Sequence, residues 1–437
     1  MRIVRACHDL GVATVVVYSE ADANSLPVQM ADEAVCVGPA TASASYLNVP
    51  HIIGAALNTE ADAIHPGAGF LAENAYFAEV CSQYRIKFIG PSPATIRAMG
   101  DKAQAREVAR EAGLPLVPGS GVVRDVVEAK EAASQLGFPV MIKAVSGGGG
   151  KGIRPVSDEG ELASVFLLAE AEARSSFGNG NLYIERVIDS PRHIEVQVLG
   201  DGKEVLHFWH RECSIQRRYQ KLVEEAPAPK ISTGLSTRIT DAAVRLMRQL
   251  NYEGAGTVEF LLDADGQFFF IEVNTRIQVE HPVTESITGV DLVKAQMQIA
   301  AGESLGIRQR DILPSGHAFE FRIIAEDPAQ DFRPDAGVIS RAQLPGGLGV
   351  RIDTHIFTDY EVPPYYDSLL AKIIVWGESR EEALARARRA LAETIVDGPA
   401  TNLDFHRLTV IDPAFAEGVY TAGHLTTLPE RVAEALT

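Results

Sequence analysis

The stretch that most constrains the fold is GTVEFLLDADGQFFFIEVNTRIQVEHPVTE, residues 256–285. An apolar run lies on each side of Asp265-Gly266, a pattern typical of a β-hairpin. If this dipeptide forms a two-residue loop, Glu259 lies directly opposite Glu272. Facing carboxylates repel each other and destabilise a sheet, whereas a divalent cation held between them reverses the sign of that interaction.

The second strand of this hairpin carries a row of polar side chains. Glu272, Asn274 and Arg276 recur every two residues and so share one face. Gln278 and Glu280 extend the row if the chain stays extended. Acids, amides and a guanidinium on one face are typical of a site for a metal and an anion. A solvated hairpin with one polar face explains the alternation equally well.

Composition limits the classes of function. The chain has 437 residues, which is enough for two or three domains, and 46% of them are hydrophobic. The net charge of −18 argues against non-specific binding to nucleic acid or to an anionic membrane. The four cysteines have no metal-ligand spacing, and we find neither a membrane-spanning run nor a signal peptide. We therefore expect a cytoplasmic protein with reduced cysteines.

The N-terminal part reads as alternating helices and strands through about residue 97, which predicts a small doubly wound parallel sheet. The first helix, RIVRACHDLG, has no strand before it, so we expect an opening strand and loop to be missing from this chain. The glycine-containing loop HPGAGFLAEN, residues 65–74, follows a strand. Such a loop is either a ligand edge or a plain connection, and its sequence alone favours the connection.

A second unit begins after residue 121. A predicted strand, residues 138–145, carries Lys143 within an apolar run, where a lysine either reaches solvent or points at a phosphate. The following SGGGGKG, residues 146–152, leads into another strand rather than a helix, and Lys151 is followed by glycine. It is therefore neither a Rossmann fingerprint nor a Walker loop. We predict a glycine-rich flap over nucleotide phosphates, with a flexible surface loop as the alternative.

Two further stretches place basic side chains among apolar ones. Residues 211–229 concentrate Arg211, Arg217, Arg218 and Lys221, which is either an anion-binding cluster or a solvated charge run. In the predicted strand that contains Arg322, the guanidinium needs an anionic partner because its neighbours are apolar.

Taken together, the glycine flap, the lysine before it and the carboxylate pair resemble the ATP-grasp superfamily, and specifically the biotin carboxylase family. The resemblance covers essentially the whole chain, through IGPSPATIRAMGDK (89–102), IKAVSGGGGKG (142–152), RECSIQRRYQKLVEEAPAP (211–229), FIEVNTRIQVEHPVTE (270–285) and PPYYDSLLAK (363–372). It implies an N-terminal α/β domain at 1–97, an ATP-grasp domain at 98–313 and a C-terminal α+β domain at 314–437.

The resemblance also implies roles for individual residues. ATP is expected to contact Lys102, Lys143, Gly149, Gly150, Glu185, Arg186, Val187, Ile188 and His193, with Tyr219 where the family has histidine. Mg²⁺ or Mn²⁺ is expected at Glu259, Glu272 and Asn274, and bicarbonate at Lys221, Arg276, Gln278 and Val279. Glu280 matches the general base, and Arg322 matches the arginine that stabilises the biotin enolate. Ala68 departs from the family, which has tyrosine there.

The implied function is ATP- and bicarbonate-dependent carboxylation of biotin, the first half-reaction of an acyl-CoA carboxylase such as the acetyl-CoA carboxylase of fatty acid biosynthesis. Because the sequence has no Met-Lys-Met motif, biotin is expected on a separate carrier, with a carboxyltransferase and a second copy of the chain as further partners. Two alternatives are another ATP-grasp ligase of the carbamoyl-phosphate type and a non-catalytic nucleotide-binding copy. The RIQVEHPVTE and PPYYDS segments favour biotin carboxylase. The final carboxyl acceptor is not encoded here.

Overall fold

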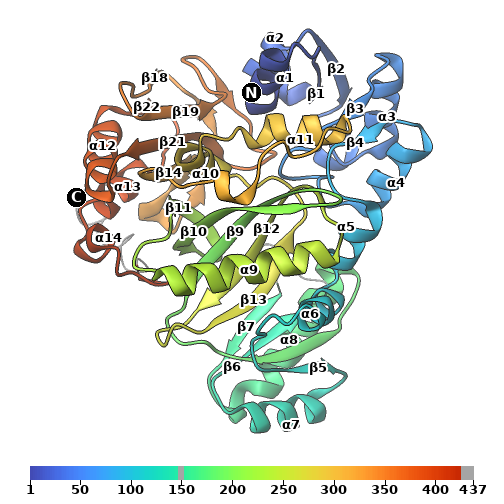
Figure 1. Cartoon of the computed structure of the whole chain (residues 1–437), viewed down its shortest axis with the longest axis vertical. Helices are drawn as coiled ribbons and strands as arrows, with labels where there is room; N and C mark the ends of the chain where they lie inside the picture. The colour runs from blue at the N-terminus through green and yellow to red at the C-terminus, as the bar shows by residue number, and fades with distance from the viewer. Residues whose placement is uncertain (146–151, 425–437) are drawn as a thin grey trace.

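The structure, a computed structural model, describes residues 1–145 and 152–424 (Figure 1). The N-terminal unit alternates helices and strands as predicted: α1 (Arg2–Leu10), β1 (Val15–Ser19), α2 (Leu26–Met30), β2 (Glu33–Gly38), α3 (Val49–Asn58), β3 (Ala63–Ile64), α4 (Ala75–Gln83) and β4 (Lys87–Phe88). The neighbouring strands are parallel, as expected. They form two separate pairs, β1–β2 and β3–β4, rather than the single sheet that we expected.

A small lobe follows helices α5 (Pro93–Gly100) and α6 (Lys102–Glu111), and the Asp101 side chain caps α6. Its four strands have the order β5-β8-β6-β7. They and their two helices are β5 (Gly119–Val123), α7 (Val126–Leu136), β6 (Val140–Ala144), β7 (Ile153–Val156), α8 (Glu159–Phe177) and β8 (Leu182–Arg186). The predicted flap connects β6 and β7, but Gly149, Gly150 and Lys151 lie outside the described residues.

An eight-stranded antiparallel sheet forms the centre of the molecule, in the order β13-β12-β9-β10-β11-β14-β21-β19 (Figure 1). Because β11 pairs with β14, this sheet continues across the domain boundary expected at residue 313. Its strands are β9 (Arg192–Asp201), β10 (Val205–Arg217), β11 (Gln220–Ala226), β12 (Glu253–Leu262), β13 (Phe268–Asn274), β14 (His317–Ile324), β19 (Val350–Thr354) and β21 (Leu369–Gly377).

Along the chain, further helices lie between the strands of the central sheet or follow them. They are α9 (Thr233–Gln249), α10 (His281–Thr288), α11 (Leu292–Ala300), α12 (Arg380–Glu393), α13 (Leu403–Thr409) and α14 (Pro413–Glu417). Ser379 caps α12: its Oγ accepts from the Glu382 backbone N–H at 3.2 Å, and the Glu382 carboxylate accepts from the N–H of Glu378, the residue before Ser379, at 2.7 Å. Three short antiparallel pairs are β15 (Glu326–Asp327) with β16 (Arg333–Pro334), β17 (Gly337–Val338) with β20 (Glu361–Val362), and β18 (Arg341–Gln343) with β22 (Ile395–Asp397).

Strand alternation gives the central sheet two different faces. On β9, Ile194 and Val196 belong to the apolar core that includes Ile239 of α9. Figure 1 shows α9 lying across this face of β9, β10 and β12. His193 and Glu195 occupy the alternate positions of β9 and therefore face the other side of the sheet. Glu259, which lies opposite Glu195 on β12, faces the same side.

The β12–β13 hairpin places Glu259 opposite Glu272, as predicted, but with a different loop length and with a shift in strand register. The Asp263 N–H donates to the Gln267 carbonyl at 2.9 Å, so the loop has three residues, 264–266, instead of two. A three-residue loop alone would place Ile271 opposite Glu259. The register shifts by one residue between Glu259 and Phe260, which leaves Ile271 as a β-bulge and restores the predicted pair.

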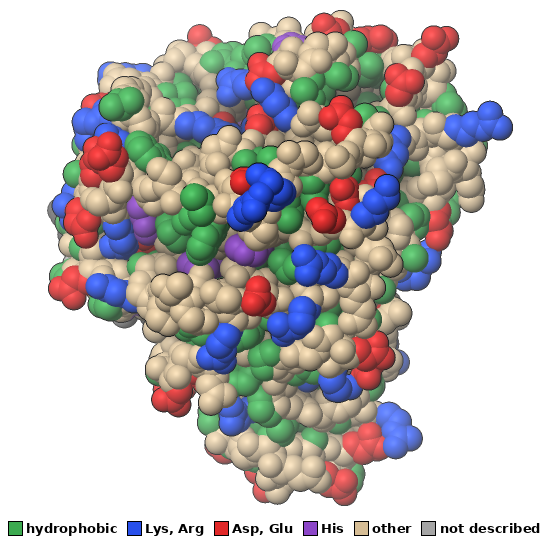
Figure 2. Space-filling view, in the orientation of Figure 1, with side chains coloured by type: hydrophobic (Ala, Val, Ile, Leu, Met, Phe, Trp, Pro, Cys, Tyr) green, Lys and Arg blue, Asp and Glu red, His purple; other side chains and the backbone are tan. Residues whose placement is uncertain are grey.

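The surface above α9 is mixed in charge. Figure 2 shows acidic and basic side chains side by side on this face, so the net charge of −18 is not gathered there into one acidic patch. Among the described residues, no helix has both the length and the apolar character that crossing a membrane requires.

A substitution at Phe260 tests whether the face of the central sheet under α9 is an apolar core. Phe260 is 0% exposed in the core beneath α9, and its ring packs edge-on against Phe268 with 5.4 Å between centroids. We expect Phe260→Ala to lower the free energy of unfolding by about 3–5 kcal/mol, since it leaves a cavity in this core. Urea unfolding measures the change. Leu313→Ala, at a side chain 69% exposed, is the control, and equal losses in both variants would contradict the assignment.

Candidate active site

Three glutamates form a row across three adjacent strands. Glu259 of β12 lies opposite Glu195 of β9 on one side and opposite Glu272 of β13 on the other. Glu195 and Glu259 are buried, at 0% and 5% exposure. Three neighbouring carboxylates repel one another strongly in such surroundings, so the site requires compensating positive charge.

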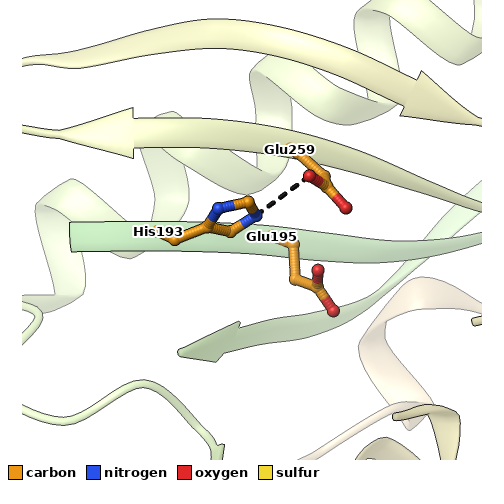
Figure 3. Close-up of side chains that lie close together, drawn as sticks. All are labelled: His193, Glu195 and Glu259. Carbon is orange, nitrogen blue, oxygen red and sulfur yellow. Dashed lines mark ion pairs between the residues drawn. The ribbon is translucent and has the colours of Figure 1, made fainter. Parts of the chain in front are cut away.

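Lys221 of β11 supplies most of that charge. Its ammonium donates to Glu195 at 2.5 Å, to Glu259 at 2.8 Å and to Glu280 at 2.7 Å. His193 adds a further contact, with its Nε2 2.9 Å from Glu259 Oε2 (Figure 3). The positive charge is thus concentrated around Glu195 and Glu259.

The pKa values follow this uneven distribution. Burial alone would raise the pKa of Glu259, but Lys221 and His193 outweigh it and lower the pKa below its usual range. Burial alone would lower the pKa of His193, but the Glu259 carboxylate raises it. The pKa of Glu272 is raised by burial and by the charge on Glu259. Among the described residues, Glu272 has no hydrogen bond or ion pair, so it is the carboxylate least compensated by positive charge.

A divalent cation fits best at Glu259, Glu272 and Asn274. These side chains offer the oxygen ligands that Mg²⁺ and Mn²⁺ prefer, and one of them, Glu272, has no ion pair with a described cation. His193, Glu195 and Glu259 also lie close enough together to bind a metal, as Figure 3 shows. Lys221 already binds both carboxylates of that second group, whereas in the first group it binds Glu259 but not Glu272, which makes the second group the poorer metal site.

The segment after β13 brings further residues to the row. The strand ends at Asn274, so Gln278 and Glu280 reach the site from a loop and not from an extended strand. Gln278 Nε2 donates to Glu259 at 3.1 Å, and the two terminal nitrogens of Arg276 lie 3.1 Å from Asn274 Oδ1 and 3.4 Å from Gln278 Oε1. The Val279 carbonyl accepts from Lys372 Nζ at 2.6 Å.

Glu280 joins this group to the C-terminal unit. Its side chain is 0% exposed, and it accepts from Lys221 and, at 2.8 Å, from Arg322 of β14. Burial alone would raise the pKa of Glu280, but these two cations hold it well below its usual range. The second partner of Arg322 is Glu224, 2.6 Å from Arg322 Nε. The sequence-based prediction that Arg322 has an anionic partner is therefore confirmed.

The residues that the resemblance implies for ATP lie mostly in the small lobe. Lys143 of β6 forms an ion pair with Glu185 of β8 at 2.5 Å. Burial lowers the pKa of Lys102, and Glu272 and Glu185 partly reverse that effect. Arg186, the residue after Glu185 and the last of β8, is exposed. Val187 and Ile188 follow directly after β8. Tyr219 lies instead at the turn between β10 and β11, with its side chain 52% exposed.

The sequence identifies the residues that support the site from behind only in part, because it places Arg211 in a basic cluster but does not predict its partners. Arg211 is fully buried; it forms an ion pair with Glu195 and donates to Gln197 at 2.7 Å and to Thr284 at 2.9 Å. Glu195 and Gln197 follow His193 at alternate positions of one strand, a polar period within an apolar run. That period is the one signal that could have identified them.

Family models match three successive parts of the chain. They are the biotin carboxylase N-terminal domain at residues 1–96, the carbamoyl-phosphate synthase L chain ATP-binding domain at 101–308 and the biotin carboxylase C-terminal domain at 320–427. The biotin carboxylase of Nostoc sp. is 54% identical over 420 residues, which are 96% of this chain and 94% of the relative. The chain belongs to the biotin carboxylase family. The flanking domains are not explained by a ligase of the carbamoyl-phosphate type.

Solved structures of this family share the fold. The biotin carboxylase of Campylobacter jejuni, in a β,γ-ATP complex, is 44% identical with a TM-score of 0.95, and the match covers 97% of this chain and 95% of that one. The biotin carboxylase domain dimer of the 2-oxoglutarate carboxylase of Hydrogenobacter thermophilus, with MgADP, ADP and bicarbonate, is 46% identical. Its TM-score is also 0.95, and the match covers 99% of this chain and 95% of that one.

A second pair of buried carboxylates lies beside Arg322. Glu224 of β11 is directly opposite Glu320 of β14, and both are 0% exposed. Burial raises the pKa of Glu224 to about 7, against the opposing effect of Arg322. Burial also raises the pKa of Glu320 well above its usual range, although Lys372 lies 3.9 Å away. The pair therefore binds a proton that an isolated carboxylate would release.

Glu320→Gln tests this pair through pH. Above about 4.5, the ordinary pKa of glutamate, the folded protein keeps a proton on Glu320 that the unfolded chain releases, so wild-type stability falls as pH rises toward the raised pKa. Glutamine does not titrate. We expect the Tm of the variant minus that of the wild type to increase between about pH 5.5 and 8.5. Glu361→Gln, at an exposed residue, is the control, and a pH-independent difference for Glu320→Gln would contradict the raised pKa.

Proposed function

We propose that this chain carboxylates biotin in a reaction that consumes ATP and bicarbonate, as the first half-reaction of a biotin-dependent carboxylase. The observation that carries the proposal is the row of three glutamates with Lys221 and Arg276 beside it, a site for a cation next to a site for an anion. The named relatives, one of them solved with MgADP and bicarbonate, support the same chemistry.

Nucleotide binding is assigned to the small lobe and its junction with the sheet. We assign the phosphates to Lys102, Lys143, Gly149 and Gly150, and the rest of the nucleotide to Glu185, Arg186, Val187, Ile188 and His193. Glu259, Glu272 and Asn274 would hold Mg²⁺, with Mn²⁺ as an alternative, and the ion would neutralise charge on the transferring phosphoryl group. Tyr219, where the family has histidine, is a further proposed nucleotide contact, although its side chain lies at an exposed turn.

Bicarbonate would bind between Lys221, Arg276, Gln278 and the backbone of Val279. Glu280 is the proposed base, although Lys221 and Arg322 make it a weak one in this structure. An incoming anion would share those cations with Glu280 and so increase its affinity for a proton. The deprotonated bicarbonate attacks the γ-phosphate of ATP to form carboxyphosphate and ADP. Carboxyphosphate breaks down into CO₂ and phosphate, the released phosphate takes the proton from N1 of biotin, and N1 attacks CO₂, while Arg322 stabilises the negative ureido oxygen.

We also propose domain boundaries for the chain and the partners with which it acts. The family models at 1–96, 101–308 and 320–427 support boundaries near those expected, at 1–97, 98–313 and 314–437. We infer that biotin arrives on a carrier protein or domain, that a carboxyltransferase consumes the product, and that the chain forms a homodimer like the Hydrogenobacter domain. We also propose a cytoplasmic location. Fatty acid biosynthesis is one candidate setting, because the partner selects the carboxyl acceptor.

The direct assay is ADP release by the purified chain with Mg²⁺, measured with and without bicarbonate and free biotin. Bicarbonate-dependent release that biotin stimulates is the expected result. ATP binding without bicarbonate-dependent turnover would contradict the proposal and favour a non-catalytic nucleotide-binding protein.

Glu280→Gln tests the base. We expect the bicarbonate-dependent rate to fall by about 10²- to 10⁴-fold, the usual contribution of a positioned base, because the amide cannot accept the proton. ATP affinity should stay within about twofold of wild type, since the lobe that binds nucleotide is unchanged. Glu79→Gln, in an exposed ion pair with Arg97, is the matched control. A near-normal rate in Glu280→Gln would remove Glu280 from this role.

A further inference from the structure

The N-terminal unit extends one carboxylate into the site. Glu73, near the end of the loop at residues 65–74, accepts from Arg276 Nε at 2.9 Å through Oε2 and from the Thr275 backbone N–H at 3.0 Å through Oε1. One side chain therefore holds both the guanidinium of Arg276 and the backbone just before it. Neither contact is predictable from local sequence, since about 200 residues separate the partners.

The loop fixes Glu73 from both sides. The preceding residues, Leu71 and Ala72, are buried, at 7% and 1% exposure. The next residue, Asn74, caps α4 by accepting from the Phe77 backbone N–H at 2.9 Å. Ala68, earlier in the loop, packs against the apolar cluster that contains Ile277. The backbone of Glu73 is thus held in place without help from Arg276.

The contact determines which edge of Arg276 is free. Glu73 engages Nε, and it is the only carboxylate paired with Arg276 among the described residues. Among the described residues, the two terminal nitrogens contact only neutral groups: the side chains of Asn274 and Gln278 at 3.1 and 3.4 Å, and the Ile277 backbone carbonyl at 3.3 Å. A guanidinium held at Nε presents its outer two nitrogens as a fork, the geometry that binds a planar oxyanion through two hydrogen bonds.

We propose that Glu73 is a positioning residue of this enzyme, which orients Arg276 and the 274–276 backbone for bicarbonate. The inference rests on the proposed function, because it assumes that Arg276 binds bicarbonate. It makes the loop at residues 65–74 part of the catalytic centre instead of a plain connection. The N-terminal unit then contributes directly to substrate affinity.

Steady-state kinetics of Glu73→Ala and Glu73→Gln test the proposal. We expect Glu73→Ala to raise the KM for bicarbonate by about ten- to a hundredfold, the effect of losing one hydrogen bond to a charged group. Glu73→Gln keeps one acceptor oxygen and should give a smaller increase. The KM for ATP should stay within about twofold of wild type, because no nucleotide contact is removed. Glu79→Ala, which breaks the exposed ion pair with Arg97 in the same unit, should change neither constant.

Two results would overturn the proposal. One is an unchanged KM for bicarbonate in Glu73→Ala; the other is a parallel loss of kcat, both affinities and Tm, which would indicate a purely structural role. If the wild type itself lacks bicarbonate-dependent turnover, the proposed function fails separately. A double-mutant cycle of Glu73→Ala with Arg276→Ala in thermal unfolding then decides: non-additive shifts in Tm support the positioning contact, and additive shifts refute it.

Discussion

The repulsion among Glu195, Glu259 and Glu272 is the constraint on which the rest of the site depends. Hydrogen-bonded strands place these carboxylates in one row, so their separation cannot relax without disrupting the sheet. Lys221 and the buried Arg211 stabilise Glu195, and Lys221 and His193 stabilise Glu259. Less positive charge lies near Glu272, whose pKa is raised by burial and by the charge on Glu259. A divalent cation and the lysines near the nucleotide would supply the missing charge at that end.

All three units of the chain contribute to this site. The central sheet supplies the glutamates, Arg322 comes from β14 beyond the expected domain boundary, and Glu73 comes from a loop of the N-terminal unit. The apolar face of the sheet packs against α9, and the opposite face carries the charged groups beside the residues that pack against α10 and α11. Because Glu280 pairs with Arg322 of the C-terminal unit and Arg276 pairs with Glu73 of the N-terminal unit, the complete site requires the three units to be packed together.

Sequence reasoning predicted the parts of the site that depend on strand period and composition. It paired Glu259 with Glu272, and it predicted an anionic partner for Arg322. It failed where geometry is set by register, because neither the bulge at Ile271 nor the end of β13 at Asn274 has a local signature. The bulge also explains why Phe270 and Val273 both pack in the core beneath α9 while Glu272 faces the site. The roles of Arg211 and Glu73 depend on distant partners.

A divalent cation is proposed to compensate the Glu272 end of the row. Anomalous diffraction from crystals grown with MnADP would locate the ion. We expect one peak within about 2.0–2.2 Å of carboxylate oxygens from both Glu259 and Glu272, with Lys221 still bound to Glu195. A peak between His193 and Glu195 with Lys221 displaced, or bound nucleotide with no metal at Glu272, would contradict it.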